Sequence, residues 1–294
     1  MNLEQLRALL AIVDEGSFEA AADALGVSAS AVSQRIRALE RTVGQMVVRR
    51  GTPCEATDAG QALVRMARHV SVIERETWAT LGRQASGRSV TALAVPADAL
   101  GTWFEPVLRE AAGWTDTTLD LHVEDQDHSA ALLRRGDVLA AVTTEPQPVP
   151  GCAVEPLGRM RYVPVAAPRL LRQHVRHGRP DLHTMPTMRF NAKDGLQAQV
   201  LDMHAPSAAP PTHLAPSFDA FHRCVRAGLG WGMLVDLQAV DDLASGRLVR
   251  LPGVDDVLVP LHWQAATLPS PGLLRLSRAV HEAAAGGLER ADRP

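Results

Sequence analysis

A polar helical stretch near the N-terminus carries the side chains best suited to contacting nucleic acid. Its apolar residues recur at spacings of four, three and four, which predicts one buried stripe; they are Val32, Ile36, Leu39 and Val43. Its polar residues fall on other faces; they are Ser30, Ser33, Gln34, Arg37 and Arg41, with Arg35 at the flank of the apolar stripe. Gln and Arg can each make two hydrogen bonds to one adenine or guanine base. The pattern predicts a helix that packs with one side and reads the DNA major groove with the other.

The residues before this stretch predict the elements that position it. Apolar residues at helical spacing between residues 6 and 13 indicate a first helix, which Gly16 ends. Ser17 can cap a short second helix, and Gly26 supplies the positive φ of a tight turn. Ser28 then caps the polar helix. A polar face alone is equally typical of an ordinary amphipathic helix, but the order of helix, turn and helix favours a helix-turn-helix.

A short hairpin follows and predicts a wing. Residues 46–49 are typical of a strand, residues 50–53 of a turn and residues 54–56 of a short return strand. Arg49 and Arg50 lie at the turn, where they can contact the sugar-phosphate backbone. The predicted DNA-binding set also includes the two capping residues on either side of these elements, Ser28 and Thr57.

The helix that Thr57 caps is long, running to about residue 81, and carries a repeat close to the a and d positions of a coiled coil. The repeat consists of Leu63, Met66, Val70, Ile73, Thr77 and Leu81. Its flanking residues are charged, and the helix leads into a linker at residues 84–88, so we expect it to dimerise. Packing of the same stripe against its own domain is the alternative.

Beyond residue 88, strands alternate with helices, which predicts an α/β domain with a largely parallel sheet. The expected strands are residues 90–95, 119–123, 138–143, 162–166, 187–190, 231–235 and 261–264. The expected helices are residues 101–112, 129–135, 196–203, 216–226 and 271–288. Two such halves, with the chain returning to the first, would leave a cleft between them.

These patterns divide the chain into three parts. We expect a winged helix-turn-helix at residues 1–58, a linker helix and hinge at 59–88 and an effector-binding domain at 89–294. Within the effector-binding domain, subdomain I takes about residues 89–164 and 265–294, and subdomain II about residues 165–264.

Composition limits the class of protein. The chain has 294 residues, of which 46% are hydrophobic and 21% charged, and this suits a globular protein of about two domains. The net charge of −3 conceals a basic excess between residues 28 and 50, where five Arg accompany one Glu. Apolar runs are short and no secretion signal is present, so we expect a cytoplasmic protein without a membrane partner. Three distant Cys and the absence of a catalytic constellation predict no metal site, no disulfide framework and no enzyme activity.

The sequence resembles the LysR family of bacterial transcription regulators. The DNA-binding signature of that family is matched by residues 17–40, SFEAAADALGVSASAVSQRIRALE, and its continuation into the linker helix by residues 57–60, TDAG. Within the family, the rest of the chain is similar to the ArgP/LysG regulators of basic amino-acid export. The similar segments are residues 94–103, 123–125, 133–138, 228–232 and 262–263, so the resemblance covers essentially the whole chain.

This resemblance implies the architecture and the partners. It implies a winged helix-turn-helix, a dimerising linker helix and a periplasmic-binding-protein-like effector domain of two Rossmann-like subdomains. It also implies a homotetramer that binds a double-stranded DNA operator and acts with RNA polymerase at the target promoter. The subfamily implies an activator of a basic amino-acid exporter gene, without a cofactor, whose effector is lysine, arginine or sometimes histidine.

Candidate effector contacts follow the predicted strands, because ligands bind α/β sheets beyond the carboxyl ends of strands. Asp98, Glu124 and Asp219 can bind the cationic groups of a basic amino acid. Thr143 and nearby backbone N–H groups can bind its carboxylate, and Gln126 lies beside Glu124. Each acid is also explained as a helix cap or a solvated charge, and Asp98 and Asp219 both stand where caps occur.

Two departures from the subfamily leave the ligand open. Pro96 stands where the subfamily usually has Asn, and Phe218 where it usually has a small residue, so we expect the ring of Phe218 to narrow the pocket. A LysR-type regulator with a different small-molecule effector is therefore the first alternative. An architectural or replication-associated DNA-binding protein, in which the effector is incidental, is an alternative from another class.

Overall fold

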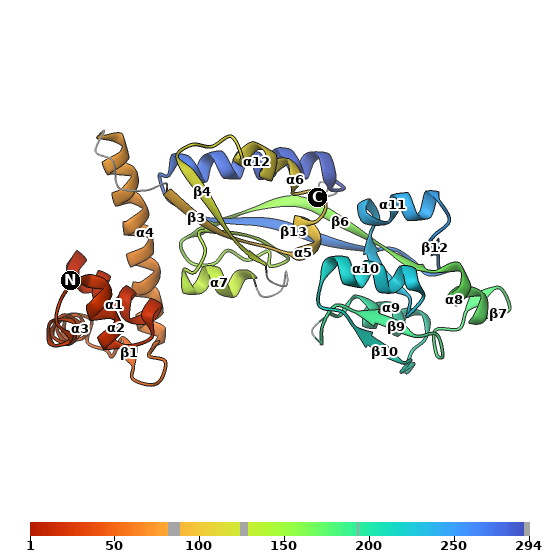
Figure 1. Ribbon diagram of the computed structural model, residues 1–294, viewed down its shortest axis with the longest axis horizontal. Coiled ribbons are helices and arrows are strands. Elements are labelled where there is room, and N and C mark those ends of the chain that lie inside the picture. Colours follow the sequence, from red (N-terminus) through yellow and green to blue (C-terminus); the bar gives the residue numbers. More distant parts are fainter. Residues whose placement is uncertain (82–88, 124–128, 193, 291–294) are drawn as a thin grey trace. The chain divides into compact units, whose positions relative to one another are not determined.

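A computed structural model describes residues 1–81, 89–123, 129–192 and 194–290 of the chain (Figure 1). The chain forms two compact units. Unit 1 comprises residues 1–95, 111–155 and 263–278, and unit 2 comprises residues 96–110, 156–262 and 279–294. The predicted linker at residues 84–88 lies outside the described residues. Among the described helices, none combines the length and the apolar composition that a membrane crossing requires.

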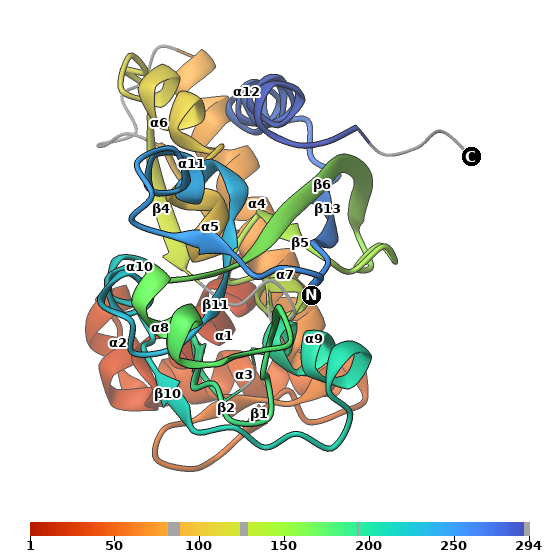
Figure 2. The same cartoon turned by 90° about the vertical axis from the view of Figure 1, so that its right-hand side faces the viewer.

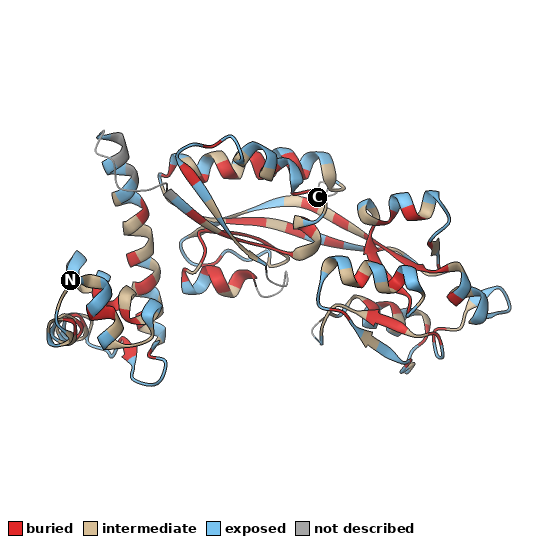
Figure 3. Ribbon diagram, viewed as in Figure 1, coloured by how far each residue is buried: buried red, intermediate tan, exposed pale blue. Residues whose placement is uncertain are grey.

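Unit 1 begins with the predicted three helices, which are Leu3–Glu15 (α1), Phe18–Leu25 (α2) and Ala29–Val43 (α3). The side chains of Ser17 and Ser28 accept hydrogen bonds from the backbone N–H groups of the third residue after each, which confirms both as helix caps. Gly26 has a φ of 63°, as the predicted tight turn requires. Buried residues of all three helices, red in Figure 3, form one core that includes Leu9, Ile12, Val32, Ile36 and Leu39.

The wing and the linker helix follow. Strand Val48–Arg49 (β1) pairs antiparallel with Glu55–Ala56 (β2), and helix Asp58–Thr80 (α4) comes next. The first strand of the wing was expected at residues 46–49 but covers only Val48–Arg49. Met46, which precedes it, is exposed. Gly60 is buried at the start of α4, where a Cβ atom would lie 1.9 Å from the carbonyl oxygen of Val47. Only glycine therefore allows α4 to approach the wing this closely.

The remainder of unit 1 is a small α/β layer. Strand Ser89–Val95 (β3) pairs in parallel with Thr117–Val123 (β4) on one side and with Ala140–Thr143 (β5) on the other. Helix Ser129–Arg135 (α7) packs against this sheet with buried Leu132 and Leu133. Helix Pro271–Gly287 (α12) begins in unit 1 and ends in unit 2.

Unit 2 contains helix Ala97–Leu100 (α5) and most of helix Glu105–Ala111 (α6), and it continues with residues 156–262. Its long strands are Cys152–Ala166 (β6) and Val257–Ala266 (β13), both of which start or end in unit 1. Its further helices are Pro168–Gln173 (α8), Leu196–His204 (α9), Phe218–Ala227 (α10) and Asp236–Ala244 (α11). Its short strands are Val175–Arg176 (β7), Arg179–Pro180 (β8), Thr187–Arg189 (β9), Thr212–Leu214 (β10), Gly232–Val235 (β11) and Val249–Arg250 (β12). Helices α9 and α10 both pack against β9 (Figure 1). Figure 2 shows the same two helices from another side.

Two expectations about this region are wrong. The sheet is mixed rather than largely parallel, because β6 pairs antiparallel with β11 and β12. Along the first part of β6, buried and more exposed residues tend to alternate, which is typical of antiparallel strands that cover one face. The helix expected at residues 101–112 is shorter than predicted: α6 covers only Glu105–Ala111, and the separate helix α5 precedes it at Ala97–Leu100. Pro106 lacks a backbone N–H and is tolerated in the first turn of a helix, which explains why α6 begins at Glu105.

Candidate functional site

The exposed face of α3 carries three of the predicted base-reading residues. Gln34, Arg37 and Arg41 are exposed, and none of them makes a hydrogen bond or ion pair with another described residue. The buried stripe of the same helix, represented by Val32 and Ile36, packs into the core of the helix-turn-helix. Helix α3 therefore presents long donor-bearing side chains outward on a support that packing holds fixed.

Three other members of the predicted DNA-binding set support the domain from within. Arg35 pairs with Glu4 of α1 across 2.7 Å. The hydroxyl of Thr57 donates to the carbonyl oxygen of Met46 at 2.7 Å and accepts from the N–H of Gly60 at 3.1 Å. Ser28 caps α3, and its hydroxyl lies 2.9 Å from that of Ser30. The contacts of Arg35 and Thr57 attach α3 to α1 and α4 to the wing.

A pocket lies where the start of α2, the first turns of α3 and the wing meet. It is lined by Ser17, Phe18, Glu19, Ala29, Ser30, Ser33, Arg50, Gly51, Thr52 and Cys54. The Arg50 guanidinium stacks over the ring of Phe18, 4.9 Å from its centroid, while Arg49 pairs loosely with Glu55 at 3.5 Å. An Arg surrounded by hydroxyl groups suits a DNA phosphate, which accepts several hydrogen bonds at once. Thr52 was not predicted as part of this site, and Ser17 was predicted only as a helix cap.

In unit 2, Asp98 is held by a residue that the sequence did not single out. The hydroxyl of Tyr162, in β6, donates to Oδ2 of Asp98, in α5, at 2.5 Å. The Tyr162 side chain is 1% exposed, whereas Asp98 is half-buried. Asp98 does not cap its helix, because the cap position is Pro96 and no side-chain cap bond is present there. The carboxylate is thus fixed on one side by a buried donor.

Phe218 lies against the same helix. A Cβ atom at Gly101, the residue that ends α5, would lie 2.4 Å from the Phe218 ring. The ring therefore occupies the space that a side chain at position 101 would fill, and it stands close to the helix that carries Asp98. Asp219 is exposed in the first turn of α10, whose cap is Ser217, so the explanation of Asp219 as a cap is wrong.

Of the remaining predicted effector residues, one belongs to unit 1 and two lie outside the described residues. Thr143 belongs to unit 1, is fully buried, and accepts a hydrogen bond from the backbone N–H of Glu145 at 3.1 Å. Glu124 and Gln126 lie outside the described residues. The structure thus places Asp98 and Phe218 at the same short helix, with Tyr162 bonded to Asp98 and Phe218 against Gly101. Across the described ranges, His, Cys, Asp and Glu side chains form no cluster of three that can hold a metal ion.

Comparisons with known proteins agree with this architecture at both ends of the chain. Residues 3–61 match the family described as bacterial regulatory helix-turn-helix protein, lysR family, and residues 84–288 match the LysR substrate binding domain. The chain belongs to the LysR family. Like other members, it is a DNA-binding transcription regulator rather than an enzyme, with a helix-turn-helix and an effector domain of the periplasmic-binding-protein type.

Several members of the LysR family are similar over almost the whole chain. The lysine export transcriptional regulatory protein LysG of Corynebacterium glutamicum is 44% identical over 290 residues, which are 98% of this chain and 99% of that protein. The solved structure of full-length LysG from the same organism with bound effector arginine has a TM-score of 0.87 at 43% identity, covering 98% and 100% of the two chains. The structure of ArgP from Mycobacterium tuberculosis has a TM-score of 0.90 at 43% identity and covers 98% of each chain.

For this LysR-family helix-turn-helix, replacing Gln34 or Arg37 with alanine tests base reading. A side chain that reads a base should weaken operator binding by about 1–3 kcal/mol while leaving binding to random DNA nearly unchanged. The measurement is a fluorescence anisotropy titration on operator and random duplexes at one salt concentration. Arg49→Ala serves as the control, because a phosphate contact should weaken binding to both duplexes equally. Equal losses for Arg37→Ala on both duplexes would contradict base reading.

Proposed function

We propose that the chain activates a gene for a basic amino-acid exporter in response to lysine or arginine, with histidine as a further effector. The observation that carries this proposal is the carboxylate of Asp98, which buried Tyr162 fixes on a short helix whose last residue, Gly101, lies against the ring of Phe218. The similarity to a lysine export regulator, and to a structure with bound arginine, supports the same ligand class.

The chemistry of this site suits a cationic side chain. A carboxylate accepts several hydrogen bonds, so Asp98, oriented by Tyr162, can also accept from an ammonium or guanidinium group. An aromatic ring close by favours a cation electrostatically and packs against a methylene stem. Asp219, in the first turn of α10, is a further candidate contact within unit 2, and contacts of the effector with Thr143, Glu124 and Gln126 stay predictions from the sequence.

The proposed partners are a double-stranded operator, a second copy of the chain and RNA polymerase at the target promoter. Apolar side chains remain exposed along α4, as a dimer contact requires: Met66, Ile73, Trp78 and Leu81. Leu63, at the start of the predicted repeat, packs against the core of the helix-turn-helix, so packing within the chain uses the start of this stripe. The later members Met66, Ile73 and Leu81 stay exposed, while buried Val64, Ala67 and Val72 occupy other positions of the helix. A homotetramer would form from two such dimers.

A second candidate keeps the regulator and changes the ligand to another amino acid or small metabolite. The contact between Phe218 and Gly101 favours it, because the ring takes up space that the small residue usual at position 218 would leave open. Pro96, which is buried, cannot offer the side-chain amide usual in the subfamily.

Calorimetric titration of the full-length protein with arginine, lysine and histidine tests the proposal. Citrulline and norleucine are the controls, since they keep the size of the side chain and remove its charge. Saturable binding of a basic amino acid, with induction from the adjacent exporter promoter, is expected. Binding of an uncharged ligand alone would support the second candidate. Salt-sensitive binding to operator and random DNA alike, with no effector response, would indicate an architectural protein.

A further inference from the structure

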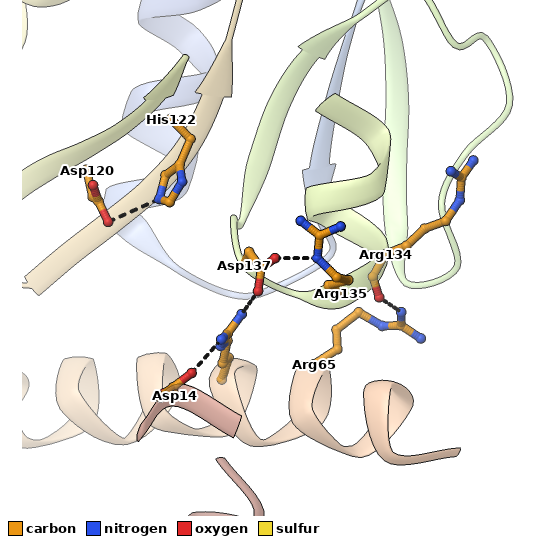
Figure 4. Close-up of polar contacts among 8 residues, drawn as sticks. Asp14, Arg65, Asp120, His122, Arg134, Arg135 and Asp137 are labelled. Atoms are coloured by element: carbon orange, nitrogen blue, oxygen red, sulfur yellow. Dashed lines mark hydrogen bonds and ion pairs between the residues drawn. The ribbon is translucent and has the colours of Figure 1, made fainter. Parts of the chain in front are cut away.

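Arg68, in the middle of α4, binds carboxylates from two different parts of unit 1. Its two partners, Asp14 and Asp137, are labelled in Figure 4. Its Nη2 atom lies 2.7 Å from Oδ1 of Asp14, in α1 of the helix-turn-helix. Its Nη1 atom lies 2.5 Å from Oδ1 of Asp137, between α7 and β5. The two partners are 54 and 69 residues away in the sequence, so one guanidinium connects three separate elements.

A second contact brings α4 against the end of α7. Nη1 of Arg65, which lies one turn before Arg68, donates to the carbonyl oxygen of Arg134 at 2.5 Å. That carbonyl belongs to the last turn of α7, where carbonyl groups lack partners within the helix and a cation is favoured. A Cβ atom at Gly136, whose φ is +73°, would lie 2.8 Å from Cα of Arg65. Glycine therefore allows the two backbones to come this close.

These ionic contacts are partly removed from water. The Arg68 side chain is 21% exposed, and the Asp137 side chain is 28% exposed. Oδ2 of Asp137 also accepts from Nε of Arg135 at 2.6 Å. Burial alone would raise the pKa of Asp137, but hydrogen bonds from Arg68 and Arg135 outweigh it and hold that pKa below its ordinary value. Removing one partner would leave a half-buried charge uncompensated, so these contacts contribute more than a fully exposed ion pair.

We propose that Asp14, Arg65, Arg68, Gly136 and Asp137 form a clasp that transmits the effector signal to the DNA-binding domain; the signal itself rests on the proposed function. A movement of α7 against α4 changes the distance between Arg68 and Asp137. Because the same guanidinium binds Asp14, this movement also changes the strength of the ion pair between Arg68 and Asp14. Helices α1 and α3 share one core, so the position of α1 affects the recognition helix. The clasp thus gives the helix-turn-helix two arrangements, with Arg68 bound to both carboxylates or to one.

Induction of the target promoter by arginine, measured with full-length variants, tests the clasp. Arg68→Gln and Asp137→Asn should each lower the ratio of induced to uninduced transcription by about 2- to 30-fold. The calorimetric Kd for arginine should stay within about twofold of that of the unchanged protein, since neither residue belongs to the proposed effector site. Arg75→Gln, an exposed residue of the same helix, is the matched control.

Asp14→Asn distinguishes the clasp from simple packing of α4 on α7, because Asp14 belongs to the helix-turn-helix and Arg68 links it to Asp137. It should lower the induction ratio as Arg68→Gln does, and the Arg68→Gln, Asp14→Asn double variant should lose little more than either single variant. Glu15→Gln, its exposed neighbour, should change nothing. Asp14→Asn and Arg68→Gln proteins with the same induction ratio as their controls would overturn the proposal.

Amide hydrogen exchange of the protein without effector separates failure of the clasp from failure of the proposed function. Residues 62–72 of α4 should exchange faster in Arg68→Gln and in Gly136→Ala, which keeps every charge but forces the backbones apart, than in Arg75→Gln. Faster exchange in a protein that responds to no basic amino acid would refute the proposed ligand and leave the clasp in place. Unchanged exchange would refute the clasp, whatever the ligand.

Discussion

The Asp98→Asn protein should bind arginine or lysine at least about 30-fold more weakly than the unchanged protein. Replacing a carboxylate that faces a buried cation typically costs about 2–5 kcal/mol, because the cation is left without a counter-charge. Asparagine keeps the size of the side chain and can still accept a hydrogen bond from Tyr162, so the change isolates the charge. Calorimetric titration of the full-length protein measures the effect.

Two further variants make this result specific. Tyr162→Phe leaves the charge and removes the donor that fixes it, so a loss of roughly tenfold, smaller than that of Asp98→Asn, is expected. Asp202→Asn, at an exposed position of α9, should bind like the unchanged protein. If Asp98→Asn binds arginine with unchanged affinity, the carboxylate serves only contacts within the protein, and the cation of the effector binds at another site.

Gly60→Ala should destabilise the winged helix-turn-helix by about 3 kcal/mol. The new Cβ atom would stand 1.9 Å from the oxygen and 2.9 Å from the carbon of the Val47 carbonyl, which are backbone atoms and cannot turn aside. The start of α4 must then separate from the wing, which also breaks the contact between Thr57 and Met46. Urea unfolding gives the free energy, and operator binding should fall with it.

The matched control for this substitution is Gly286→Ala in α12. No atom lies within 4 Å of the Cβ position at Gly286, and its φ is not in the left-handed region, so alanine should stabilise the helix by a few tenths of a kcal/mol to about 1 kcal/mol. Opposite signs for the two substitutions would establish the close approach of α4 to the wing. A Gly60→Ala protein as stable as the unchanged protein would show that the wing can move away freely.

The sequence alone was sufficient to predict the helix-turn-helix. Its signals are local: Ser17 and Ser28 bond to backbone groups three residues away, and Gly26 takes up a φ that other residues avoid. The apolar stripe of α3 also depends only on helical periodicity, and its members are buried as predicted, except that Val43 is only half-buried. The motif at residues 17–40, compared with a known family, then supplied the function.

Tertiary structure decided which polar side chains are available. Arg35 and Arg37 are two residues apart on one helix and look alike in the sequence, yet the first is paired with Glu4 and the second is exposed. Tyr162 and Asp98 are 64 residues apart, and Arg68 is 69 residues from Asp137. Periodicity and capping rules describe neighbours along the chain, whereas the partner of a charged or hydroxyl group is set by the packing of distant elements. The sequence by itself therefore determined the helix-turn-helix and the family, and only the packing of the chain decided how the Asp98 carboxylate and the Arg68 guanidinium are held.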